Sequence, residues 1–196
     1  MRLRDAVMPL AALALFACEA GEEADEAEAA EASQELPGER VGALIEEEEN
    51  LSTFARAAET AGLAESFDGP APYTVFAPSD EAFAALPEGE LERLMGEEQR
   101  AALTGLVTYH IVPGVILSKD LAAALERGEG EEVEQATLGG LPVTVSKDGK
   151  RLVLTDIAGN EARVVAADRR GANGVVHVID TVLRPETEAG EGGGEE

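Results

Sequence analysis

The sequence has one cysteine, no tryptophan and only seven aromatic residues among its 196. One cysteine excludes a disulfide framework within the chain. Basic residues are scarce as well: 15 Lys and Arg stand against 40 Asp and Glu, which gives a formal net charge of -25. Binding to nucleic acid or to anionic lipid depends on clustered basic residues. The composition therefore argues against both kinds of partner.

The acidic excess is strongest at the two ends of the chain. Residues 19–38 contain eight acidic residues and no basic one, and residues 186–196 contain five acidic and no basic residues. Such segments bury too little apolar surface to fold. We therefore expect an acidic tether over residues 18–38, one folded domain over residues 39–185, and a disordered Gly/Glu tail over residues 186–196.

The first 17 residues have the pattern of an export signal. Arg2 and Arg4 precede an uncharged, mostly apolar run from Ala6 to Ala17, which is too short to span a membrane as a helix. Cys18 follows Leu15-Phe16-Ala17, and this arrangement resembles a bacterial lipobox, in which the cysteine becomes the lipidated first residue. We expect a lipid anchor on Cys18 that holds the protein at the cell envelope, in the periplasm or on the surface. Secretion without a lipid is the alternative.

Hydrophobic periodicity predicts mainly helices in the first half of the folded region. We expect caps at Asn50 or Ser52 and at Ser79, and a helix end at Gly62. The expected helices lie around residues 41–45, 51–61, 79–86, 91–112 and 118–125, and one strand covers residues 73–77.

The second half changes to the alternation that is typical of strands. After a Gly/Glu-rich loop, strands are expected over residues 141–145, 152–154, 162–167 and 175–179, with a hairpin turn at residues 147–150. The last strand is nearly continuously apolar, which predicts that both of its faces are covered. The order of elements predicts an α+β fold in which N-terminal helices pack against a C-terminal, mainly antiparallel sheet or sandwich.

Three segments of the chain together resemble the fasciclin-type domain family. They are Thr74–Phe83, Tyr109–Gly114, and Asn173–Asp180 with Val182–Pro185 after it. The resemblance covers residues 39–185 and implies an extracellular module for adhesion or surface interaction, not known for catalysis. In animal relatives the Tyr-His neighbourhood has been implicated in receptor binding, so the resemblance points to Tyr109 and His110 as binding residues.

Both histidines, His110 and His177, lie in these segments and allow two interpretations. They could be metal ligands or a general base, or neutral rings that satisfy buried backbone groups. We favour the second, because a metal site needs three or four ligands and the sequence offers two histidines and the remote Cys18. Aliphatic neighbours similarly favour burial of Tyr109 beside His110. We expect no cofactor, metal or catalytic residue, since no nucleophile elbow, phosphate-binding loop or zinc-protease motif is present.

The sequence thus predicts a monomeric interaction module. Its partner would be a surface protein or a polysaccharide, and it would touch the membrane only through its lipid. Two alternatives remain open. One is a small-molecule-binding or enzymatic protein with a pocket where helices meet the sheet. The other is a stable envelope protein without a specific ligand.

Overall fold

A computed structural model describes residues 38–127 and 132–185 of the protein. The predicted export signal, Cys18, nearly all of the tether and the C-terminal tail fall outside these ranges. The expectations about them therefore stay predictions.

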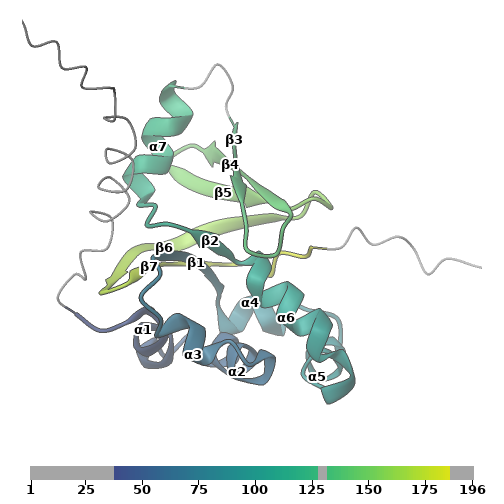
Figure 1. Cartoon of the computed structure of the whole chain (residues 1–196). Helices are drawn as coiled ribbons and strands as arrows, with labels where there is room; N and C mark the ends of the chain where they lie inside the picture. The colour runs from purple at the N-terminus through teal and green to yellow at the C-terminus, as the bar shows by residue number, and fades with distance from the viewer. Residues whose placement is uncertain (1–37, 128–131, 186–196) are drawn as a thin grey trace, which may run out of the picture. The chain divides into compact units, whose positions relative to one another are not determined.

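The described residues combine short helices with one seven-stranded sheet (Figure 1). The helices are α1 (Val41–Glu47), α2 (Ser52–Ala61), α3 (Ala64–Phe67), α4 (Asp80–Ala84), α5 (Glu90–Leu94), the 3₁₀ helix η1 (Glu97–Gln99), α6 (Arg100–Tyr109) and α7 (Ser118–Arg127). The strands are β1 (Tyr73–Pro78), β2 (Ile111–Pro113), β3 (Glu132–Ala136), β4 (Pro142–Asp148), β5 (Arg151–Thr155), β6 (Glu161–Gly171) and β7 (Gly174–Ile179).

The strand order is β2-β1-β7-β6-β5-β4-β3. All neighbouring pairs are antiparallel except β1 and β7, which run parallel. The α+β class with a mainly antiparallel sheet is confirmed. The sheet is not purely C-terminal, however, because β1 and β2 come from the helical half of the chain and extend it beyond β7.

The prediction that residues 91–112 are largely helical holds for α5, η1 and α6, and it is wrong at its end. The chain forms α5, η1 and α6 in turn, and Ile111 and Val112 then enter β2. Val75 pairs with Ile111 across the β1–β2 ladder. β-Branched residues suit a strand that pairs with its neighbour, and this tertiary contact overrides the helical spacing of the apolar residues.

Strand β3 lies where the sequence predicts a Gly/Glu loop. It pairs with β4 in antiparallel register, with Val133 opposite Val145. Its two glutamates, Glu132 and Glu134, are exposed while Val133 is half-buried. β3 stands at the end of the strand order, and charged residues on such an edge oppose pairing with other chains.

Two hydrophobic cores lie on the two faces of the sheet. In Figure 1, α1 to α6 lie on one side of β1 and β7, whereas α7 lies beside β3, β4 and β5. Strand β1 serves both cores, since Val75 and Ala77 join the helical core and Phe76 joins the core under α7. All six residues of β7 are buried, so the prediction that both faces of the last strand are covered is confirmed.

Helix α2 begins differently from the expectation. Neither Asn50 nor Ser52 caps it with a side chain. Instead Thr53 N donates to Asp80 Oδ1 at 2.7 Å, and Ser52 Oγ donates to Asp80 Oδ2 at 2.9 Å. The first turn of α4 thus supplies the acceptor for the first turn of α2. The caps predicted at Gly62, in the left-handed conformation, and at Ser79, which accepts from Ala82 N, are confirmed.

Candidate functional site

The structure places both predicted binding residues in the interior. Tyr109 ends α6 and His110 links α6 to β2, and both residues are 0% exposed. Burial agrees with the interpretation of this pair as core residues. A partner cannot touch either side chain while the domain keeps this conformation, so any role in binding must act through the residues around them.

Tyr109 connects α6 to one end of the sheet. Its hydroxyl donates to Pro142 O at 2.9 Å and lies close to the backbone of Ile157. The β4–β5 register, with Thr144 opposite Thr155, places Pro142 opposite Ile157 when it is continued by two residues. The hydroxyl therefore lies at the end of the β4–β5 ladder. Burial raises the pKa of Tyr109, which keeps the phenol protonated as a donor.

His110 connects the end of α6 to the segment after β7. Leu183 N donates to Nε2 at 3.1 Å, so Nε2 is an acceptor. Nδ1 then carries the proton and donates to Leu106 O at 2.8 Å. Burial lowers the pKa of His110 to about 4, although the bond to Leu106 acts in the opposite direction. The ring is neutral at pH 7, and both nitrogens are occupied by backbone groups.

His177 plays the same part on β7. Its Nδ1 accepts from Asp168 N at 3.3 Å, and its Nε2 donates to Ile116 O at 2.9 Å. Burial lowers its pKa as well. The ring stacks on Phe76 with 5.4 Å between centroids. Neither histidine can act as a metal ligand or a base without breaking bonds to the backbone.

Asp156 is a buried carboxylate that the sequence analysis missed. It is 5% exposed and accepts from the backbone N–H groups of Ala158, Asn160 and Arg184 at 2.8 to 3.0 Å. It fixes the loop between β5 and β6 and ties that loop to the segment after β7. A lone Asp after a strand, followed by Gly159 and Asn160, is a local turn signal that could have pointed to it.

Three exposed apolar residues lie in the β3–β4 turn and the β5–β6 loop, and we call them the apolar patch: Leu138 (46% exposed), Leu141 (37%) and Ile157 (39%). Leu138 and Leu141 lie in the β3–β4 turn. Gly139 N in this turn donates to Thr108 O at 3.1 Å, and a Cβ on Gly139 would lie 3.0 Å from the Tyr109 backbone. The turn is thus seated directly on the Tyr-His segment, and Ile157 lies across from it.

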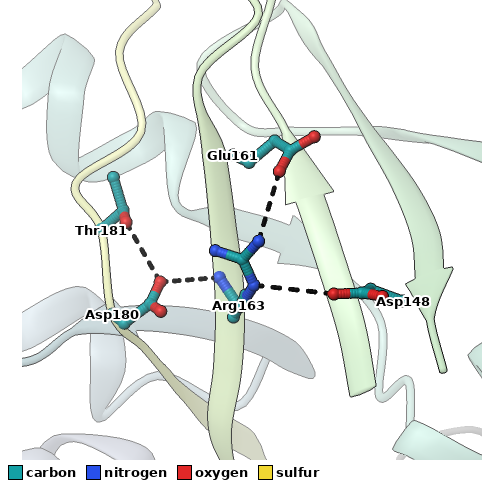
Figure 2. A network of polar contacts seen from close by, with 5 residues as sticks. All are labelled: Asp148, Glu161, Arg163, Asp180 and Thr181. Carbon is teal, nitrogen blue, oxygen red and sulfur yellow. Dashed lines mark hydrogen bonds and ion pairs between the residues drawn. The ribbon is translucent and has the colours of Figure 1, made fainter. Parts of the chain in front are cut away.

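A polar network lies along β6 at the end of β7 (Figure 2). The Arg163 guanidinium reaches Glu161 at 3.6 Å and Asp148 at 3.9 Å. Asp180 Oδ1 accepts from Arg163 N at 2.7 Å and from the Thr181 hydroxyl at 3.0 Å. The Arg163 side chain is 41% exposed, so water screens its ion pairs and they contribute little to stability. The bonds to Asp180 instead fix the path of the chain as it leaves β7.

Within residues 38–127 and 132–185, no three His, Cys, Asp or Glu side chains are grouped as a metal site would need. Over the same residues, no helix combines the length and the apolar character that crossing a bilayer requires.

Known proteins share this sequence and architecture. The family model described as Fasciclin domain matches residues 49–185. Protein sll1483 of Synechocystis sp. is 42% identical over 138 residues, which cover 70% of this chain and 68% of that protein. Human periostin is 32% identical over 152 residues, covering 76% of this chain but 16% of periostin. The pig transforming growth factor-beta-induced protein ig-h3 is 36% identical over 69% of this chain and 18% of its own length.

A solved structure shares the fold. It is a FAS1 domain pair from the insect cell adhesion molecule Fasciclin I, with a TM-score of 0.64 and 18% identity, and the match covers 74% of this chain and 50% of that one. This chain therefore spans about half of the insect pair and under a fifth of the two animal proteins. Because the family model covers well over half of the sequence, the chain belongs to the Fasciclin domain family.

Proposed function

We propose that the protein is an extracytoplasmic, surface-anchored interaction module that binds a partner in the envelope, the matrix or a neighbouring cell through the apolar patch. The observation that carries this proposal is that Leu138 and Leu141 are exposed in the turn whose Gly139 N donates to Thr108 O, and that Ile157 is exposed in the loop opposite Pro142 in the continued β4–β5 register. Single exposed apolar residues are common on proteins, whereas a cluster on one short turn and the facing loop is typical of an interaction surface.

The composition of the patch favours a protein as the partner. Its side chains are aliphatic, and the centres of protein interfaces are depleted of charge and enriched in apolar contacts. Relatives of this chain include periostin, and the matching fold occurs in an insect cell adhesion molecule. In this proposal Tyr109 and His110 are positioning residues that hold the turn and the loop from beneath. The test must also distinguish a polysaccharide partner from a protein partner.

The test measures saturable binding of the labelled full chain to intact producing cells. Leu138→Ser with Leu141→Ser removes the apolar side chains from the turn and should weaken binding by about tenfold or more, since each central contact contributes on the order of 1 kcal/mol. Val165→Ser is the matched control, because Val165 is 57% exposed on β6 outside the patch. Equal binding of the double variant and the wild type would contradict the proposal. Binding that is lost only after glycan removal would assign the partner to polysaccharide.

The anchor is tested separately by intact-mass spectrometry of detergent-extracted protein. The proposal expects a mature chain that begins at Cys18 and carries a diacylglyceryl group, which Cys18→Ser removes. A full-length chain with a free thiol would contradict export. Cleavage without lipid would indicate a freely secreted protein.

A further inference from the structure

A hollow of about 260 Å³ lies where α4 meets the segment that follows β7. Ala82, Ala85 and Leu86 form one wall, and Asn160, Asp180 and Thr181 form another. This is a junction between helix and sheet, the kind of place at which the sequence leaves a small-molecule site open as an alternative. None of these residues belongs to the apolar patch, so the two surfaces can be tested independently.

The polar wall offers hydrogen-bond acceptors. Asp180 uses Oδ1 for Arg163 N and the Thr181 hydroxyl, which leaves Oδ2 without a partner among the described residues. Asn160 Nδ2 donates to Asp156 Oδ2 at 2.9 Å. The side-chain oxygen of Asn160, Oδ1, has no partner among the described residues. No buried side-chain oxygen or nitrogen of residues 38–127 and 132–185 lacks a partner, so these two oxygens are accessible to a ligand.

The charge of the hollow selects against anions. The Arg184 guanidinium on its rim donates to Glu90 Oε2 at 3.1 Å, and both side chains are only about one-fifth exposed. This cation is already matched by a carboxylate, whereas Asp180 leaves one carboxylate oxygen for a ligand. A ligand must therefore supply hydrogen-bond donors to Asp180 Oδ2 and to the Asn160 side-chain oxygen, and it must not carry a negative charge.

The opposite wall is aliphatic. Ala85 is exposed and Leu86 is half-buried there, whereas Ala82 and Val182 are 2% and 3% exposed and contribute little surface. A ligand that fits has hydroxyl donors on one edge and C–H groups on a face. At about 260 Å³ the hollow lies below the range of about 300–1,000 Å³ that is usual for drug-sized ligands, which suits a single ring. A pyranose ring has all of these properties.

We propose that this hollow binds one pyranose residue of a neutral glycan. Its hydroxyls donate to Asp180 Oδ2 and to the Asn160 carbonyl oxygen, and its C–H face packs on Ala85 and Leu86. This site extends the protein's role beyond the apolar patch, because it recognises a sugar by residues that the patch does not use.

The test titrates the full chain with methyl glycosides of glucose, galactose, mannose and N-acetylglucosamine, followed by protein NMR. Glucuronic acid and glucosamine serve as the anionic and cationic probes. The proposal expects at least one neutral glycoside to bind saturably, with shifts at Asn160, Thr181 and Ala85, and expects glucuronic acid not to bind. If no neutral glycoside saturates, if glucuronic acid binds equally well, or if glucosamine alone binds, the proposal is overturned.

The decisive variant is Ala85→Phe, which fills the hollow without removing any hydrogen bond. It should weaken the neutral glycoside by at least about tenfold. Ala84→Phe is the matched control, because Ala84 is the preceding exposed alanine and does not line the hollow. Leu138→Ser, in the apolar patch, should bind the sugar as the wild type does. If Ala85→Phe does not fold, Ala85→Leu takes its place, and unchanged affinity in a folded variant contradicts the proposal.

Discussion

At the scale of single residues, His110 and Tyr109 stabilise the fold through hydrogen bonds to distant backbone groups. His110→Leu keeps an apolar side chain but leaves Leu106 O and Leu183 N unpaired in the core, so it should lower the free energy of unfolding by about 2–4 kcal/mol. Tyr109→Phe removes one hydroxyl and should cost about 1 kcal/mol. Urea unfolding measures both. If the pair served only to contact a partner, neither variant would be destabilised.

The two histidines also predict a dependence of stability on pH. Burial lowers the pKa of His110 from 6.5 to about 4 in the folded state, and that of His177 in the same direction. Above pH about 6.5 both states are unprotonated and their contribution to stability is complete. As the pH falls from about 6.5 to about 4, the unfolded chain takes up the protons first, so His110 alone removes about 3 kcal/mol.

Proton NMR of the histidine rings measures this directly. In the folded protein the His110 ring resonances should keep the positions of neutral imidazole down to pH about 5, and those of His177 should titrate below the ordinary value of 6.5. A midpoint near 6.5 for either ring in the folded protein would contradict the structural role.

The sequence predicts that these histidines are structural, because each lies among aliphatic neighbours and further metal ligands are lacking. It does not predict their partners. Leu183 N lies 73 residues from His110, and Ile116 O lies 61 residues from His177. Such contacts are set by tertiary packing. Asp156 was missed for a similar reason, since its bond to Arg184 N closes a contact over 28 residues.

At the scale of elements, α2 depends on a cap that belongs to α4. Hydrogen bonds from Thr53 and Ser52 outweigh the effect of partial burial and lower the pKa of Asp80. Asp80→Ala should therefore lower the free energy of unfolding by about 1–2 kcal/mol, the usual cost of a lost cap. Glu81→Ala, at the next position of α4, is exposed and should change it by less than about 0.5 kcal/mol. Equal effects of the two changes, measured by urea unfolding, would contradict the shared cap.

The parallel pairing of β1 with β7 requires a glycine at its start. A Cβ on Gly174 would lie 2.2 Å from Tyr73 O and 2.8 Å from Val41 Cγ2, so Gly174→Ala must separate β1 and α1 from β7. We expect a loss of at least about 2 kcal/mol or failure to fold. Gly105→Ala in α6 meets nothing within 4 Å and should stabilise the protein by about 0.5–1 kcal/mol. Thermal unfolding compares the two, and tolerance of Gly174→Ala would contradict this register.

Local patterns predict most elements, and they fail where neighbours decide. Residues 73–77 and 175–179 form strands as expected, and the chain turns at Gly149-Lys150, within the predicted hairpin turn. At β2 the sequence predicts the end of a helix, because the strand's residues continue an apolar run. β3 was missed because its glutamates hide the alternation around Val133. Both strands form because they hydrogen-bond to a neighbouring strand. The local sequence does not show which segment will pair with them.

At the scale of the whole molecule, the sequence accounts for the domain and its family, while the proposed interaction surface could be located only from the fold. The family resemblance points to Tyr109 and His110, and both are buried. The exposed residues Leu138, Leu141 and Ile157 come from two loops, and the proximity of these loops to Tyr109 follows from the β4–β5 register and the hydrogen bond from Tyr109 to Pro142 O. The acidic character persists in the folded part, since residues 39–185 hold 26 acidic and 13 basic residues. This favours partners reached through an apolar surface.

Hydroxyl-radical footprinting of the full chain, free and bound to intact cells, tests the central claim most directly, because it reports the exposure of individual side chains. In the free protein Leu138, Leu141 and Ile157 should be oxidised together with Val165, since all four are more than a third exposed. The account predicts that binding protects Leu138, Leu141 and Ile157 and leaves Val165 reactive. Protection elsewhere, with these three side chains still oxidised in the bound state, would contradict it.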